Sequence, residues 1–586
     1  MLLMKQSLLK YAQILFLVVY FVLGIFSAHQ VGITLDEDAE HTTLLTNVAA
    51  IDGLYHGDLA GFNKLDTYVD RYNGIGFQIL AYPITRIVAP LLTHYTNLNS
   101  GAVELLTVHS CIFICFFLSG IFIQKILQVL LADKLVAWLG MAVYLLWPYL
   151  LGHGLMNPKD MPFLLGWLMT TYYLILIYQS PSPHHQQSAN MQYWAYLGLA
   201  VGWMIALRIN GLLLFIVYFI SFWISARLLG RKVAEFKKGA ILFLWVAILT
   251  NFLFTPLFWD SALNVYRAVQ FLITGSWDGP PTTPGSYVIP SLDLTYNVAQ
   301  LSFSPVFWSF PIDFIRALKR FQQVLYQGTT FTAGNFLSTL DLPASYIPLW
   351  LSVKLPLLSL LGLVLIPFAV LRKKIPAHAL AIPTGFVGIA VGAVMIVTAL
   401  IVRHARLHDE LRHILFIFPM LWVIGVCSWY YLSRSLAIGA LVLTGILFAN
   451  DVSKIHPYEY VWFNEPARAL QLENQYENDY WATSVGPAHQ WFEEHVPMPV
   501  QECIYMYPSH LNYYLDSQRY LCVRGFGDTG VKELTPPEQG QSYWIFKSAR
   551  FRNLEIPSNC KVVHEEKAAL TFSSNPITVA QIYHCK

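Results

Sequence analysis

Long apolar windows separated by polar loops dominate the chain up to residue 450. About 20 predominantly apolar residues are needed for a helix to cross a hydrocarbon core of about 30 Å. Windows of this kind begin near residues 10, 102, 134, 160, 193, 211, 238, 347, 378, 411 and 430. The pattern predicts a transmembrane domain over residues 1–450 with about 11 helices. Two longer polar loops interrupt it, at residues 29–101 and 259–345.

The pattern changes after residue 450. Short runs with the alternation of half-buried strands occur at residues 503–507, 543–547, 561–564 and 577–583, and a helical pattern covers residues 484–495. These elements predict a small soluble α/β domain over residues 451–586. We therefore expect an α-helical polytopic membrane protein with a small C-terminal α/β domain.

Composition agrees with a chain that folds mostly in lipid. Hydrophobic residues make up 55% of the sequence and charged residues only 12%, whereas soluble domains have about a quarter charged residues. The net charge is +2, from 37 basic and 35 acidic residues. This balance produces no long-range field that would gather nucleic acid, so we expect membrane lipids and no nucleic acid among the partners.

Basic residues predict the orientation of the chain. We interpret the first apolar window as a signal anchor that leaves Lys5 and Lys10 in the cytoplasm. Further basic residues then fall in predicted cytoplasmic loops, as the positive-inside rule requires: Arg227, Arg231, Lys232, Lys237, Lys238, Arg372, Lys373 and Lys374. Both long loops and the tail would lie outside, as in a multi-pass protein of a bacterial inner membrane with a periplasmic domain. An amphipathic stretch at residues 311–326 is expected on the membrane surface.

The tail holds four of the seven cysteines. An even number of cysteines fits an oxidising compartment, and sequence alone allows three pairings of four. We favour Cys503 with Cys522 and Cys560 with Cys585, on neighbouring strands. The alternative is four reduced structural thiols.

Charged residues gather at the predicted outer boundary of the membrane. A charge near the centre of a membrane helix costs about 2.5 to 3.5 kcal/mol on insertion scales, so each such residue needs a reason. The candidates for a functional site are Asp36, Glu37, Lys159, Asp160, Arg208, Lys354, Arg412 and His413.

Asp36 and Glu37 suit general-base chemistry, because a nearby cation can hold one of two adjacent carboxylates ionised while it accepts a proton. The alternative is a solvated helix N-cap. The basic candidates suit a phosphate group, as does the helix start near Lys159 and Asp160. Alternatively, Asn157 caps that helix with Pro158 in its first turn, and Lys354 extends its amine to the interface. The sequence assigns no metal ligands and leaves a divalent metal open as a cofactor.

Several segments resemble the GT-C superfamily of membrane glycosyltransferases, in particular the bacterial relatives of protein O-mannosyltransferases and of lipid A aminoarabinose transferases (glycosyltransferase family 39). The resemblance extends over most of the chain and rests on the order of these segments and on their predicted position on the same side of the membrane. They are residues 35–37, 157–162, 342–350, 354–356, 411–416, 456–464 and 478–481.

The resemblance implies an inverting hexosyl or pentosyl transfer from a polyprenyl-phosphate donor to an acceptor hydroxyl on the outer face. Asp36 would deprotonate the acceptor, Glu37 would position it, and the basic candidates with Asp160 would hold the donor phosphate. The acceptor, whether lipid, glycan or protein, stays open. The rival interpretation is a transporter or lipid-binding permease, but the chain lacks the inverted repeats expected of one.

Overall fold

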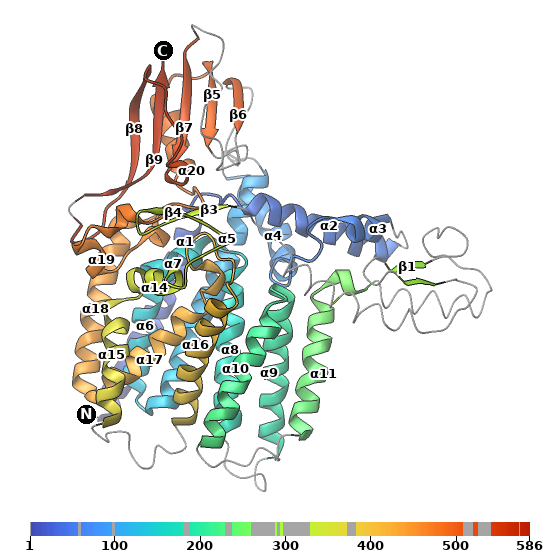
Figure 1. The fold of residues 1–586 in the computed structure, drawn as a ribbon, viewed down its shortest axis with the longest axis vertical. Helices are drawn as coiled ribbons and strands as arrows, with labels where there is room; N and C mark the ends of the chain where they lie inside the picture. The colour runs from blue at the N-terminus through green and yellow to red at the C-terminus, as the bar shows by residue number, and fades with distance from the viewer. Residues whose placement is uncertain are drawn as a thin grey trace.

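The computed structural model describes most of the chain. The described residues are 2–56, 60–95, 100–179, 187–228, 237–259, 287–289, 294–296, 314, 328–371, 383–507, 520–525, 541–573 and 575–586. A bundle of long helices forms one end of the molecule and a β-sheet forms the other, with the C-terminus at the far end of the sheet (Figure 1).

Apolar helices of different lengths build the bundle. They are α1 (Leu2–Ala28), α5 (Ser100–Leu131), α6 (Lys134–Leu146), α7 (Pro148–Met156), α8 (Asp160–Gln179), α9 (Gln187–Leu207), α10 (Gly211–Leu228), α11 (Lys237–Leu253), α14 (Tyr346–Lys354), α15 (Leu357–Leu371), α16 (Pro383–Val402), α17 (Ile417–Leu432) and α18 (Arg434–Ile455). Each predicted window corresponds to one of these helices or to one of the pairs α6–α7 and α14–α15. The expected polytopic helical membrane protein with a small C-terminal sheet is therefore confirmed.

The helices differ in whether they could cross a membrane alone. Among the described residues, five are long and apolar enough, and the bent pairs α6–α7 and α14–α15 would raise this number to seven. The bends are 63° and 115°. A proline causes each bend, because the residue before a proline is disfavoured in the helical conformation. Trp147, before Pro148, has ψ 110°, and Leu355, before Pro356, has ψ 138°.

The first polar loop forms short helices instead of an irregular connection. It contains α2 (Glu37–His56), α3 (Ala60–Thr67) and α4 (Gln78–Thr93), which lie at the end of the bundle that carries the sheet (Figure 1). In the second loop, η2 (Pro256–Phe258) precedes two antiparallel hairpins, β1 (Tyr287–Ile289) with β2 (Leu294–Tyr296) and β3 (Thr329–Thr332) with β4 (Asn335–Ser338). Apart from Phe314, the amphipathic stretch expected at residues 311–326 lies outside the described residues.

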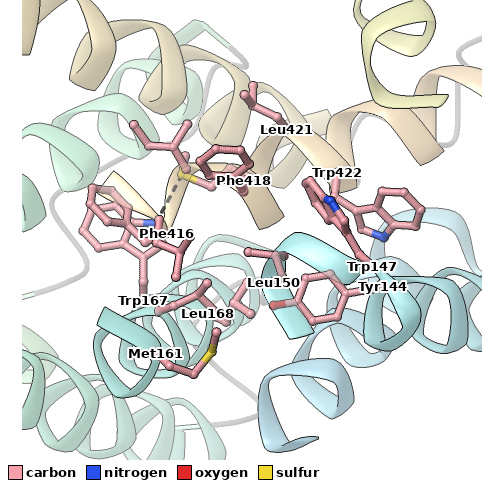
Figure 2. Packing of buried hydrophobic residues seen from close by; sticks show 14 of the residues in the cluster. Tyr144, Trp147, Leu150, Met161, Trp167, Leu168, Phe416, Phe418, Leu421 and Trp422 are labelled. Atoms are coloured by element: carbon pink, nitrogen blue, oxygen red, sulfur yellow. Dashed lines mark hydrogen bonds between the residues drawn. The ribbon is translucent and has the colours of Figure 1, made fainter. Parts of the chain in front are cut away.

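Aromatic and sulfur-containing side chains pack the centre of the bundle (Figure 2). The Trp167 indole donates to the Met420 sulfur at 3.2 Å, and its ring lies 4.4 Å from that of Phe416. Trp147 and Trp422 are fully buried with ring centroids 5.9 Å apart. These contacts join α7 and α8 to the start of α17, which is where several candidate site residues lie.

The tail folds as a mixed five-stranded sheet in the order β6-β5-β7-β9-β8. The strands are β5 (Val500–Tyr507), β6 (Tyr520–Gly525), β7 (Tyr543–Ser548), β8 (Cys560–Ala568) and β9 (Ile577–Cys585). Four strands and the helix α20 (Val485–His495) match the predicted runs. Sequence patterning missed β6, a short edge strand paired in parallel with β5.

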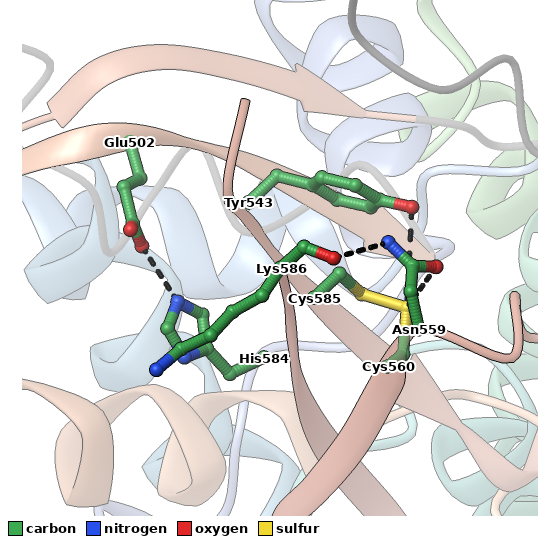
Figure 3. Close-up of a disulfide and its surroundings, with 7 residues drawn as sticks. All are labelled: Glu502, Tyr543, Asn559, Cys560, His584, Cys585 and Lys586. Carbon is green, nitrogen blue, oxygen red and sulfur yellow. Dashed lines mark hydrogen bonds and ion pairs between the residues drawn. A yellow bond between two sulfur atoms is a disulfide. The ribbon is translucent and has the colours of Figure 1, made fainter. Parts of the chain in front are cut away.

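Both favoured disulfides are confirmed, joining Cys503 to Cys522 and Cys560 to Cys585. Each bridge connects residues that are direct partners in the sheet register, between β5 and β6 and between β8 and β9. In Figure 3 the second bridge lies beside the chain terminus, where the Asn559 amide donates to the Lys586 carbonyl at 2.9 Å. The bridges therefore fasten both edges of the sheet.

Residues between α18 and the sheet belong to the core of the bundle. The expected boundary at residue 450 lies inside α18, and Asp451 accepts from the Trp462 indole at 2.7 Å and pairs with Arg468 at 2.9 Å. The following segments are η5 (Glu459–Val461), α19 (Glu465–Ala469) and η6 (Leu472–Gln475). Because these segments pack against the bundle, they carry the next residues, Tyr480 and Trp481, to the candidate site.

Candidate active site

Asp36 lies at the turn between α1 and α2, at the sheet end of the bundle. Arg412 Nη1 donates to Asp36 Oδ2 at 2.5 Å, and the Trp481 indole donates to the same oxygen at 3.2 Å. Partial burial raises the pKa of this carboxyl, but the charge and hydrogen bond of Arg412 outweigh burial and hold the pKa below its usual value. Asp36 is therefore ionised near neutral pH.

Asp409 is a second carboxylate that binds the same arginine. Arg412 Nη2 lies 2.7 Å from Asp409 Oδ2, and Arg550 Nη1 lies 3.0 Å from Asp409 Oδ1. Asp409 and Glu410 have φ values of 53° and 60°, a conformation that costs energy for residues other than glycine and is often found at functional sites. Arg550, from η9 (Ala549–Phe551), is the contribution of the C-terminal sheet to this cluster.

Glu37 has a different environment from its neighbour Asp36. Its carboxylate is buried, accepts from the Thr34 backbone N–H at 2.5 Å and pairs with His109 Nε2 at 2.8 Å. These contacts fasten the first loop to α5. Glu37 thus supports the backbone around Asp36, and neither contact is with the arginine that binds Asp36.

Lys159, Asp160 and Arg208 form a second charged group near the start of α8. Lys159 Nζ lies 2.5 Å from Glu40 Oε1, and Arg208 pairs with Asp160. The charge of Asp160 also reaches the first group, because Asp36, Asp409 and Asp160 together hold the pKa of Arg412 above its usual value although burial lowers it. The two groups therefore act as one electrostatic cluster.

The start of α8 also has the cap that the alternative interpretation expected. Asn157 Oδ1 accepts from the backbone N–H groups of Lys159 and Asp160 at 3.2 and 2.8 Å. Its amide Nδ2 donates to Asp160 Oδ2 at 3.0 Å. Asn157 therefore fixes the orientation of the carboxylate that holds Arg208.

Lys354 and His413 differ from the other candidates. Lys354 is 0% exposed, so it does not extend to the interface. Its amine lies 2.9 Å from Glu410 Oε1 and 4.1 Å from the centre of the Phe463 ring. Burial lowers the pKa of His413 well below its usual value, as do the neighbouring His408 and Arg412, so its ring carries no positive charge near neutral pH.

Sequence reasoning missed Asp409, Glu410, Trp481 and Arg550. The first two directly precede the Leu411-Arg412-His413 motif, and Trp481 closes the motif at 478–481, so proximity to these motifs was an available signal. Arg550 had no such signal, because it lies 141 residues from its partner Asp409.

The carboxylates Asp36 and Asp409 bind guanidinium groups. Across the described ranges of the chain, no group of three or more His, Cys, Asp or Glu side chains could hold a metal ion. Asp36 and Asp409 are separated by the guanidinium of Arg412, which binds an oxygen of each. The site is thus an alternating array of carboxylates and guanidinium groups.

The fold and this cluster define an α-helical polytopic membrane protein with a charged site where the bundle meets its C-terminal sheet. No protein-family model and no curated protein sequence matches the chain. Among solved structures it is similar to the apo oligosaccharyltransferase of Archaeoglobus fulgidus, with 12% identity, a TM-score of 0.43, and coverage of 89% of this chain and 66% of that chain.

It is also similar to ArnT from Cupriavidus metallidurans. For ArnT bound to undecaprenyl phosphate the identity is 12%, the TM-score 0.31 and the coverage 97% of both chains. For ArnT in the apo state the identity is 11%, the TM-score 0.30, and the coverage 99% of this chain and 98% of that one.

Proposed function

We propose that this chain is a membrane glycosyltransferase that moves a sugar from a polyprenyl-phosphate donor to an acceptor hydroxyl, with Asp36 as the general base. One observation carries the proposal: Asp36 is the accessible carboxylate of an otherwise buried cluster. Its side chain is 41% exposed, compared with 6% for Asp409, 3% for Asp160 and 2% for Glu37. Asp36 can meet a substrate while Arg412 keeps it ionised.

The reaction needs a base that accepts the proton of the acceptor hydroxyl and cations that stabilise the negative charge of the leaving phosphate. The acceptor oxygen forms a bond to the anomeric carbon from the face opposite the phosphate, its proton passes to Asp36, and the bond from carbon to the phosphate oxygen breaks. The anomeric configuration is thereby inverted, and the lipid phosphate leaves with the bonding electron pair. Because the proton is transferred as the oxygen loses electron density, a carboxylate with a low pKa can still act as the base.

The cations for the leaving phosphate would be Arg412, Lys159 and Arg208. Each is paired with a carboxylate in this structure, and an incoming phosphate would compete with those carboxylates for hydrogen bonds. Lys354 and His413 fit this role less well, because Lys354 is buried against Glu410 and His413 is uncharged. Undecaprenyl phosphate is the ligand named for one ArnT structure, and it is a lipid phosphate of the kind that the proposed donor would release.

We propose that the site lies on the periplasmic side of the membrane, in agreement with the orientation predicted from the basic residues. The first loop and the C-terminal sheet lie at one end of the bundle (Figure 1), and the cluster includes Asp36 from that loop and Arg550 from the sheet domain. This end would be the periplasmic side of a bacterial inner membrane. The C-terminal sheet would then lie over the site on that side. Which sugar and which acceptor are used would be decided on that side.

The deciding experiment measures release of lipid phosphate by the purified full-length protein in detergent. Polyprenyl phosphates carrying different hexoses or pentoses would be offered with and without lipid and glycan acceptors. We expect release with at least one donor and its loss in Asp36→Asn. Binding of the donors without release of lipid phosphate under any of these conditions would instead favour a lipid-binding permease.

A further inference from the structure

Arg550 is the link between the C-terminal sheet and the charged cluster. It lies in η9, directly after β7, and its side chain is only 8% exposed. Its Nη1 donates to Asp409 Oδ1 at 3.0 Å and also to the Tyr480 carbonyl oxygen. A side chain from the soluble domain is therefore buried inside the site of the membrane domain.

Through this contact, four side chains form a row of alternating charge. Arg550 binds Asp409, Asp409 binds Arg412 at 2.7 Å, and Arg412 binds Asp36 at 2.5 Å. Asp409 and Asp36 thus hold different nitrogens of one guanidinium group. The position of Arg412 depends on the balance between the two carboxylates.

Removal of Arg550 would draw Arg412 toward Asp409 and away from Asp36. Asp409 would keep its negative charge with one cation fewer, so it would attract Arg412 more strongly and repel the charge on Asp36. The charged or titratable groups that act on Asp36 are His408, Asp409 and Arg412, which belong to one segment, and Arg550 from the tail. Arg550 therefore acts on Asp36 in two ways: directly, because its charge lowers the pKa of Asp36, and through the contact with Asp409.

We propose that Arg550 is a positioning residue: by neutralising Asp409 it leaves Arg412 free to hold Asp36 as an ionised, accessible base. The C-terminal domain then completes the site of the membrane domain instead of only covering it. The catalytic meaning of this inference rests on the proposed function. The electrostatic coupling between Arg550 and Asp36 can be measured without turnover.

Arg552 provides a matched control, because its hydrogen bonds go to backbone carbonyl oxygens and not to Asp409. Its guanidinium donates to the carbonyl oxygens of Asn474 and Tyr476 at 3.0 and 2.8 Å and lies 4.8 Å from the centre of the Phe331 ring. Loss of Arg552 should loosen the docking of the sheet to a degree comparable with loss of Arg550. It should leave the pairing of Asp409 with Arg412 unchanged.

The experiment is pH-dependent labelling of Asp36 by a water-soluble carbodiimide and an amine, read by peptide mass spectrometry on the full-length protein. Carbodiimides react with the protonated carboxyl group, so labelling reports the ionisation of Asp36. In Arg550→Gln we expect the labelling profile to move to higher pH, with about 3- to 10-fold more label at a pH above the wild-type midpoint, as for a shift of half a unit to one unit. Arg550→Lys, which keeps the charge, should move less, and Arg552→Gln should match wild type.

A second arm tests the route through Asp409. The shift caused by Arg550→Gln should become at least about twofold smaller when Asp409→Asn is already present, because residues in one network are not additive. Equal shifts in both backgrounds, equal shifts for Arg550→Gln and Arg552→Gln, or an unchanged profile would each overturn the inference. If Arg550→Gln fails to fold, Asp409→Asn alone provides the test: because the charge of Asp409 raises the pKa of Asp36, its loss should move the labelling profile to lower pH, and an unchanged profile would overturn the inference. Absence of lipid phosphate release by the wild type would count against the proposed function alone.

Discussion

Asp36 and Arg412, separated by 376 positions in the sequence, form an ion pair of 2.5 Å at the end of the helical bundle. Asp36 follows the first helix and Arg412 precedes α17, so the pair exists only when both ends of the bundle sequence have assembled. Because Asp409 binds a second nitrogen of Arg412, the arginine is held from two sides. This geometry leads to the following predictions.

Replacement of Asp36 by Asn should abolish the base while it keeps the shape of the side chain. Turnover should fall by roughly 10² to 10⁴, the usual contribution of a general base, with donor binding largely retained. Lipid phosphate release and donor binding measure the two effects separately. Asp52→Asn, on the exposed part of α2 where Asp52 pairs with His56 at 3.6 Å, is the control and should behave as wild type. Normal turnover in Asp36→Asn combined with loss in Asp160→Asn would move the base to the start of α8.

Replacement of Arg412 by Ala should weaken donor binding more than it slows the bound reaction. The charge-assisted contact to the donor phosphate would already exist in the ground state, so its loss raises KM. Initial rates over a range of donor concentrations give the two constants. Arg434→Ala is the control, since Arg434 pairs with Asp133 outside the cluster. A fall in kcat with an unchanged KM would show that Arg412 serves the transition state only.

Stability should decrease as the pH rises toward 7, and Asp479 should contribute to this decrease. Burial raises the pKa of Asp479 to about 7 despite hydrogen bonds from Ser484 and Tyr460, whereas an unfolded aspartate has a pKa of about 3.9. Between these values the folded protein holds a proton that the unfolded chain has lost, so stability is highest at the acidic end of the window and falls as pH rises. The apparent melting temperature in detergent, measured from pH 5 to pH 8, should vary less in Asp479→Asn than in wild type. An identical pH dependence in both would contradict the assignment.

The disulfides should protect the four tail cysteines from alkylation without reductant. Intact mass should show no labelled Cys503, Cys522, Cys560 or Cys585, and the buried Cys111, Cys115 and Cys427 should react only after unfolding. Replacement of one pair by serine should cost about 2 to 4 kcal/mol of stability, because a cross-link acts largely on the unfolded chain. Labelling of all four tail thiols in the folded protein would refute the pairing in solution.

Cysteines at the two ends of the bundle should differ in their access from outside the cell. Ser338→Cys, on the exposed part of β4 beside the sheet, should react with a membrane-impermeant thiol reagent on intact spheroplasts. Lys134→Cys, exposed at the start of α6, should react only after lysis. The reverse pattern would place the charged cluster on the cytoplasmic side and would contradict the proposed periplasmic location.

Much of the molecule was predictable from the sequence because its signals are local. A membrane helix needs only a sufficient length of apolar residues, and strand alternation is visible within a few positions. Asp36, Lys159, Arg208 and Arg412 were identifiable for the same reason, since a charge beside an apolar window is costly wherever the rest of the chain lies. The short edge strand β6 was missed because it has little pattern of its own and is defined by pairing with β5.

The partners of those charges were decided only by the tertiary structure. Sequence placed Glu37 beside Asp36, yet packing of α1 against α5 turns Glu37 toward His109 and leaves Asp36 with Arg412. Sequence also grouped Lys354 with the other cations, whereas the fold buries it against Glu410. Arg550 entered the cluster from the soluble tail without any local signal. An ion pair depends on distances of a few ångströms, and for residues more than a hundred positions apart only the packing of helices and sheet determines those distances.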